Sequence, residues 1–215
     1  MQDNNVLVTD HRYAHTARFW RESLSQVAGV YRIAPHGPGR QPARRLSRTV
    51  PLTRASVDVL RRIGDGELGE FAVAAAGIAF LLWKYFRIPV TVLGTPGLAA
   101  QPSARAAAIP LIIEVRPDER VDDYLARVAA IVEDSYAAPH FPLDTLVRNE
   151  KDMDVAQLTR VALADDRVHQ APTLRDDDLQ IALRLARGEI DLHHSDAIEP
   201  FVIDGFANSL GAVLE

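Results

Sequence analysis

Cysteine is absent from the 215 residues of this sequence, and long apolar runs are scarce. Without a thiol the chain forms neither disulfides nor thiolate sites for zinc or iron–sulfur clusters, and it has no thiol nucleophile. Because that composition fits a reducing setting, we expect a cytoplasmic protein. The first residues, Met1–Asp10, are polar and show none of the apolar core that marks a secretory signal.

A basic excess is also missing. The 24 Lys and Arg residues stand against 29 Asp and Glu, which gives a net charge of -5. Neutralising phosphates needs a basic excess, so we do not expect nucleic acid as a partner. The longest apolar run, Phe71 to Trp83, is shorter than the roughly 20 residues that span a membrane. It predicts a helix buried inside a domain, and we expect no membrane partner.

Hydrophobic periodicity predicts strands that alternate with helices. Helical spacing of apolar residues predicts helices at 12–27, 54–63, 68–86, 120–136 and 199–214, with one helical turn at 142–147. Short apolar segments predict strands at 46–52, 90–93, 109–115, 159–163, 179–185 and 189–193. This order predicts an α/β fold: a two-layer sandwich in which α-helices cover a mixed β-sheet.

Several residues predict where these elements begin and end. Thr53 and Asp118 are suited to cap the helices that follow them. Arg187–Gly188 predicts the hairpin turn between the last two strands. Gly94–Gly97 is too short and proline-interrupted for a phosphate loop, and we interpret it as a turn at a strand end. Residues 101–108 are expected to form a loop.

A segment rich in proline, glycine and arginine divides the chain. It predicts three parts: an N-terminal helix with its lead-in at 1–33, a linker at 34–45 and one main domain at 46–215. Arginines make the linker region basic, but no aromatic residues are interleaved with them. We therefore interpret it as a solvated surface connection instead of a docking patch.

Candidate catalytic residues are few. The sequence contains no dinucleotide-binding or phosphate-binding glycine motif, no HExxH and no GxSxG. The cluster His193-His194-Ser195-Asp196 is the strongest candidate for a base or a metal site. However, neighbouring side chains of a strand point to opposite faces, so the cluster is expected to be a hydrated strand end with a turn at Asp196. His140 lies alone in a loop and is expected to be structural. We expect no cofactor and no metal.

Several segments, in their order, resemble the C-terminal lobe of a nonribosomal peptide synthetase condensation domain, which belongs to the chloramphenicol-acetyltransferase-like group. Phe19-Trp20-Arg21-Glu22-Ser23-Leu24 is similar to that family's aromatic-Trp-Arg-x-x-Leu helix. An apolar helix over 72–86 leads into Val90–Pro96, which is similar to a "V-x-G-T-P" strand. Ile109-Pro110-Leu111 matches the "L-P-L" of the following strand. Residues 189–192, Ile198 and the last helix are similar to the closing strand and helix. The resemblance covers about residues 13–215.

A further segment looks like a degraded copy of the family's "H-Q-D-Y-P-F-E" motif. It runs from Ala138 to Asp144, with Ala138 in place of the motif's histidine. Four later positions keep its character: Phe141 stands for the tyrosine, Pro142 for the proline, Leu143 for the phenylalanine and Asp144 for the glutamate. We expect His140, Phe141, Pro142 and Asp144 to have a structural role and identify no catalytic residue.

The function that we expect depends on a motif of that family that this sequence lacks. The resemblance places catalysis in an HHxxxDG motif of the N-terminal lobe, and this chain begins after that point. His193-His194 is not a displaced copy, because its aspartate follows two residues later instead of four. The resemblance therefore implies a non-catalytic structural or interaction module in nonribosomal peptide biosynthesis. The implied partners are adenylation, carrier or N-lobe condensation domains, or a second copy in a homodimer.

Two enzyme hypotheses remain open at this point. In the first, the chain is half of a split condensation enzyme, completed by a separate N-lobe and forming amide bonds between carrier-bound substrates. In the second, it is a small-molecule acyltransferase that uses His140 or His194.

Overall fold

The computed structural model describes residues 3–27, 33, 44–99, 108–137, 142–151, 154–169 and 179–213, with residues 3–13 described in their backbone. Within these ranges six strands form one sheet in the spatial order β1-β6-β5-β4-β2-β3. The helices are α1 (Asp3–Ser25), α2 (Arg54–Ile63), α3 (Gly66–Phe86), α4 (Val121–Ala137), α5 (Leu143–Lys151), α6 (Val155–Leu158) and α7 (Pro200–Val213). The strands are β1 (Arg45–Pro51), β2 (Val90–Thr95), β3 (Ile109–Glu114), β4 (Val161–Asp165), β5 (Leu179–Arg184) and β6 (Glu189–Ser195).

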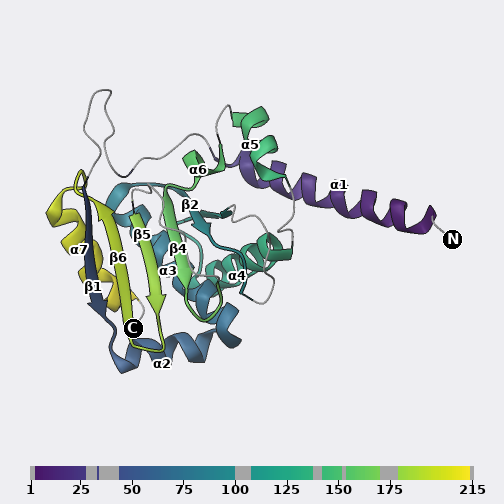
Figure 1. Ribbon diagram of the computed structural model, residues 1–215. Coiled ribbons are helices and arrows are strands. Elements are labelled where there is room, and N and C mark those ends of the chain that lie inside the picture. Colours follow the sequence, from purple (N-terminus) through teal and green to yellow (C-terminus); the bar gives the residue numbers. More distant parts are fainter. Residues whose placement is uncertain are drawn as a thin grey trace.

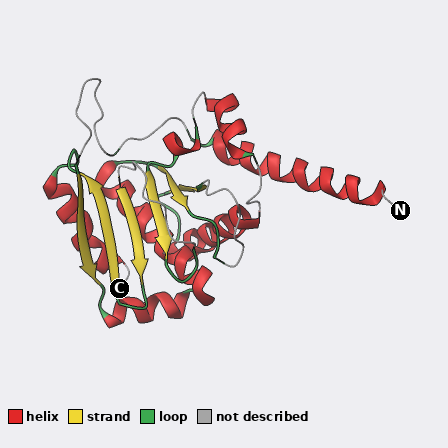
Figure 2. Cartoon of the chain, in the orientation of Figure 1, coloured by secondary structure: helices red, strands yellow, loops and turns green. Residues whose placement is uncertain are grey.

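Sheet and helices form two layers, as predicted. Helices α3, α4 and α7 lie behind the sheet, while α1 projects away from it beside α5 (Figure 1). The sheet is mixed: β1, β6 and β5 are antiparallel, β5, β4 and β2 are parallel, and β3 is antiparallel to β2. The α/β sandwich with a mixed sheet is thereby confirmed (Figure 2).

The predicted hairpin between the last two strands is confirmed. β5 and β6 pair so that Leu183 lies opposite Ile190. The turn between them contains Gly188 with a φ of 67°, a left-handed conformation that glycine adopts without a steric penalty. Leu183 and Ile190 are fully buried on the side of the helices, so the alternation of these strands sets which face packs on the core.

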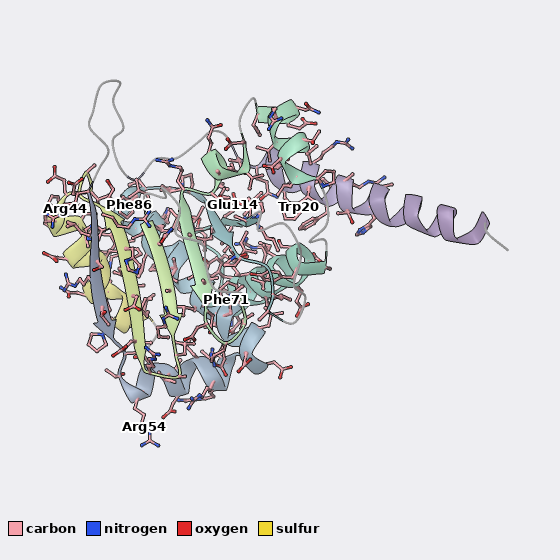
Figure 3. All side chains as sticks on the ribbon, in the orientation of Figure 1. Trp20, Arg44, Arg54, Phe71, Phe86 and Glu114 are labelled. Atoms are coloured by element: carbon pink, nitrogen blue, oxygen red, sulfur yellow. The ribbon has the colours of Figure 1, made fainter. Side chains whose placement is uncertain are left out.

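Helix α3 lies at the centre of the apolar core. Phe71, Ile78 and Leu82 along its length are fully buried, and Figure 3 shows Phe71 in the middle of the domain. By length and composition α3 could cross a membrane, but more than half of that apolar window is buried inside the protein. This burial is what a core helix of a folded domain shows, in agreement with the sequence-based expectation.

Helix α1 is joined to the same core. Trp20, Leu24 and Val27 are buried at helical spacing and belong to the cluster that contains the α3 and sheet residues. Lys151 at the end of α5 donates a hydrogen bond to the Val27 carbonyl at 2.8 Å. Most of the predicted linker lies outside the described residues, and the division into three parts stays a prediction.

Several helix limits differ from the expected ones. α1 begins at Asp3, nine residues earlier than expected at Arg12. Asp118 does not cap α4, because the helix begins at Val121 and its first hydrogen bond runs from the Tyr124 N–H to the Arg120 carbonyl. Helix α5 has nine residues instead of one turn. The short helix α6, with its capping box, was not predicted.

The N-cap predicted for α2 is confirmed. The Thr53 side chain accepts a hydrogen bond from the Ser56 N–H at 3.1 Å. In the sheet, β4 ends at Asp165, two residues later than expected, and β6 continues to Ser195. The predicted turn at Gly94–Gly97 is shifted, since Gly94 and Thr95 belong to β2. Residues 101–107 of the expected loop lie outside the described ranges.

Helix α3 ends at a residue whose backbone conformation suits glycine. Arg87 has φ 56° and ψ 35°, in the left-handed region, and its N–H bonds to the Trp83 carbonyl at 2.9 Å. A side chain in that region costs about 1 kcal/mol that glycine avoids. We expect Arg87→Gly to raise the free energy of unfolding by about 0.5–1 kcal/mol, measured by urea denaturation.

A matched control lies three residues earlier on the same helix. Lys84 is exposed and helical, so Lys84→Gly should lower the stability by about 1 kcal/mol. Equal losses in both variants would contradict a left-handed cap at Arg87.

Candidate functional site

The degraded family motif lies before and within the first turn of α5. His140 and Phe141 fall outside the described residues. The carbonyl of Pro142 accepts hydrogen bonds from the N–H groups of Thr145 and Leu146, which starts the helix. The Asp144 carboxylate accepts the Val155 N–H at 3.4 Å and so links α5 to α6. These contacts agree with the structural role expected for Pro142 and Asp144, and that role stays a prediction.

The two adjacent histidines are separated by the sheet. His193 is partly buried, whereas His194 is 7% exposed and lies on the other side of β6. Their opposite orientation was predicted from strand geometry. The expected strand end with a turn at Asp196 is confirmed, because β6 ends at Ser195 and Asp196 is an exposed turn residue. The expected hydration of this end is wrong at His194 and Ser195, since both are buried. The two rings therefore do not form one site.

A chain of buried polar side chains lies at the other end of the sheet and was not predicted. The Tyr136 hydroxyl of α4 is 2.8 Å from Thr95 Oγ1 at the end of β2 and 2.5 Å from His169 Nε2. The Asp165 N–H donates to His169 Nδ1 at 2.9 Å, and the Thr95 hydroxyl donates to the Ile109 carbonyl at 3.1 Å. All three side chains are at most 5% exposed.

The directions of these hydrogen bonds fit together in only one way. Because Nδ1 accepts from a backbone N–H, the proton of the neutral His169 ring sits on Nε2. Nε2–H then donates to the Tyr136 oxygen, and the Tyr136 hydroxyl donates to Thr95 Oγ1. We name this set, from Asp165 N–H through His169, Tyr136 and Thr95 to the Ile109 carbonyl, the buried relay.

A buried ion cluster adjoins the relay. Arg167 follows β4 and donates to both carboxylate oxygens of Asp165, at 3.1 and 2.8 Å. Its other nitrogen donates to the Glu70 carboxylate of α3 at 2.7 Å. The Asp165 side chain is fully buried, and those of Arg167 and Glu70 are exposed by 16% and 11%. Two buried carboxylates thus share one guanidinium.

Burial controls the protonation of the relay. Desolvation raises the pKa of the Tyr136 hydroxyl above its ordinary value, and the hydrogen bond that this hydroxyl donates to Thr95 opposes the rise. Desolvation lowers the pKa of His169 to about 4, and its contacts with Asp165 offset this in part. Hydrogen bonds with Asp165 raise the pKa of Arg167. At neutral pH Tyr136 and His169 are therefore both neutral, and Arg167 is charged.

These buried hydrogen bonds and ion pairs are suited to stabilising the fold, and less to catalysing a reaction. A general base needs a free lone pair within reach of a substrate proton, whereas both ring nitrogens of His169 are engaged inside the core. Among the residues that the structure describes, no group of His, Asp and Glu side chains is arranged to hold a metal ion. In the sequence, Asp165 and His169 simply follow the strand predicted at 159–163, and local patterns do not distinguish them from surface residues.

No protein-family model matches this sequence, and no curated protein matches it. Solved structures match its fold. The starter condensation domain of rhizomide synthetase RzmA, in complex with C8-CoA and Leu-SNAC, superposes with a TM-score of 0.67 at 14% identity, over 95% of this chain and 52% of that chain. The condensation domain of the monacolin K polyketide synthase MokA gives a TM-score of 0.67 at 10% identity, over 98% of this chain and 58% of that one.

These comparisons concern the fold. The chain spans about half the length of the condensation domains that it matches. The resemblance predicted from the sequence motifs is confirmed at this level: the chain has the fold of about half of a condensation domain.

Proposed function

We propose that this chain is a non-catalytic structural or interaction module in nonribosomal peptide biosynthesis. The observation that carries the proposal is the extent of the match. Nearly all of the chain, 95%, aligns with the RzmA condensation domain, but only 52% of that domain is represented. A fold alone does not fix function, so the proposal also depends on the residues of this chain.

Those residues favour a module that does not catalyse. The HHxxxDG motif that the family resemblance assigns to catalysis is not in the sequence. His193 and His194 lie on opposite sides of β6, and the buried relay keeps His169 inside the core. In the degraded copy of the family's "H-Q-D-Y-P-F-E" motif, Ala138 stands in place of the histidine.

The proposed partners follow from the half-domain match. We propose adenylation, carrier or N-lobe condensation domains of a synthetase, or a second copy in a homodimer, and a cytoplasmic setting. Large apolar side chains are exposed at the starts of two helices: Val121 of α4 is 69% exposed and Phe201 of α7 is 72% exposed. Exposed apolar surface is typical of interaction sites, which is consistent with a protein partner.

A second candidate function is half of a split condensation enzyme. In that case a separate N-lobe would supply the HHxxxDG histidine, and this chain would supply walls of the substrate channel. The observation that favours it is that 95% of this chain superposes on 52% of the RzmA domain, which leaves about half of a domain for a separate N-lobe to supply.

Complementation distinguishes the two functions. The purified chain is mixed with a separately expressed condensation N-lobe that bears HHxxxDG, and with carrier-tethered acyl and aminoacyl substrates. Complex formation is followed by size-exclusion chromatography and the amide product by mass spectrometry. The proposal predicts no product, whether or not a complex forms. If product forms, and is lost when the second motif histidine of the N-lobe is changed to alanine, the module proposal is wrong and the chain is half of a split enzyme.

A further inference from the structure

The buried relay connects segments that are far apart in the sequence. Tyr136 is separated by 41 residues from Thr95 and by 33 residues from His169. Through these side chains the last turn of α4 is bonded to the end of β2 and to the turn after β4. The backbone follows the same pattern, because Leu98 forms a bridge with His169 and the Ala99 N–H bonds to the Val168 carbonyl.

Each link of the relay has a fixed direction, so an added proton on His169 disturbs it. Protonation of His169 would put a hydrogen on Nδ1, which faces the Asp165 N–H at 2.9 Å. Two donors would then face each other, and the buried Asp165 N–H would lose its acceptor. The Asp165 carbonyl is 3.2 Å from Nδ1 but already accepts the N–H groups of Val168 and His169.

The groups around the ring come from three elements. Tyr136 of α4 bonds to Nε2, and Phe71 of α3 contacts the ring edge-on, with centroids 4.6 Å apart. Asp165 of β4 is the nearest carboxylate, but Arg167 occupies both of its oxygens and also binds Glu70 of α3. The negative charge nearest to His169 is therefore already paired, and it stabilises an imidazolium only in part.

We propose that His169 is the proton-sensitive element of a latch, and that its protonation releases the end of α4 from the ends of β2 and β4 while the rest of the sheet stays paired. The latch is closed when the ring is neutral with its proton on Nε2. It opens when Nδ1 is also protonated, because the relay then loses its first hydrogen bond and the charged ring moves toward water.

The direction of the pH effect follows from linkage. Burial sets the pKa of His169 at about 4 in the folded chain, below the ordinary value of about 6.5. Above pH 6.5 the closed latch is therefore fully stable. As the pH falls from about 6.5 toward 4, the open state takes up a proton that the closed state does not, and the closed state is progressively lost.

Nuclear magnetic resonance on the whole chain tests the latch. With histidine labelled, the His169 ring should show the Nε2–H tautomer at pH 7 and titrate at least about one pH unit below an ordinary histidine. Over the same pH range the amide signals of Leu98, Ala99 and Asp165 should change, while far-UV circular dichroism stays constant. A ring in the Nδ1–H tautomer, a midpoint near 6.5, or loss of the circular dichroism signal at the same pH would each overturn the proposal.

A pair of variants separates His169 from the other buried histidine. His169→Gln removes the titrating ring and should abolish the acid-induced change at Leu98 and Ala99. His194→Gln is the control, because this histidine is also buried but lies on β6, outside the relay. If His169→Gln still shows the acid-induced change at Leu98 and Ala99 at the same pH, the proposal is overturned. If this variant does not fold, the tautomer of the His169 ring in the wild-type chain decides the proposal.

Discussion

Replacing Gly64 with alanine is expected to lower the free energy of unfolding by at least about 3 kcal/mol. Gly64 lies at the corner between α2 and α3, where its N–H bonds to the Leu60 carbonyl at 2.8 Å. A Cβ atom at this position would lie 2.3 Å from the Glu70 nitrogen and 2.6 Å from the Glu70 Cα. Both are backbone atoms, so no rotation of a side chain relieves the clash and the corner itself must move.

The reason for the glycine is the close approach and not its backbone angles. Gly64 has φ −79° and ψ 137°, which any residue adopts. The added Cβ therefore displaces the junction of α2 and α3. This displacement also disturbs the ion cluster, because the Glu70 carboxylate accepts a hydrogen bond from Arg167 at 2.7 Å. Urea denaturation of the variant measures the loss.

Gly211 provides the matched control. It lies within α7, and a Cβ there meets no atom within 4 Å. Gly211→Ala should raise the stability by up to about 1 kcal/mol, since alanine is the better helix former. A Gly64→Ala variant as stable as the wild type would show that α2 and α3 do not approach as described.

The second large effect is expected on removing the arginine of the ion cluster. Arg167→Met keeps a long side chain but leaves the carboxylates of Asp165 and Glu70 buried without a cation. Breaking a buried charge pair by removing one partner costs about 3–5 kcal/mol, mainly because an uncompensated charge stays in the core. We expect a loss of about 3 kcal/mol in the free energy of unfolding, measured at pH 7 by urea denaturation.

An arginine at the surface of the same sheet is the comparison. Arg184 pairs with Asp166 at 3.3 Å and Asp191 at 3.5 Å, and its side chain is 34% exposed. Water screens these pairs, so Arg184→Met should cost less than about 1 kcal/mol. Similar losses in the two variants would mean that the carboxylates near Arg167 are hydrated and not buried.

Local sequence patterns predicted most of the sheet and its helices because those patterns report burial. The period of the apolar residues located β3, β5 and α2, and Arg187–Gly188 located the hairpin turn, since each feature depends on neighbours in the sequence. The same local signals misplaced the cap of α4, although its expected start at Arg120 is only one residue early. Asp118 has the side chain of a cap, but the preceding proline and the turn hydrogen bond from the Glu119 N–H to the Arg116 carbonyl delay the helix.

The buried relay and the ion cluster could not be predicted in this way. Thr95, Tyr136 and His169 meet only because β2 and β4 are parallel neighbours and α4 packs against β3 beside them. Asp165 ends a short strand and resembles a surface residue in sequence, whereas the fold encloses it completely. Tertiary contacts decide such sites, and one sequence contains no signal for them.

The rate of amide formation by the purified chain tests the central claim most directly. The chain is incubated alone with carrier-tethered acyl and aminoacyl thioesters, and the product is quantified by mass spectrometry in a single turnover. A non-catalytic half of a condensation-like fold predicts the same rate as in the protein-free control. Amide product formed above that background by the chain alone would contradict the account.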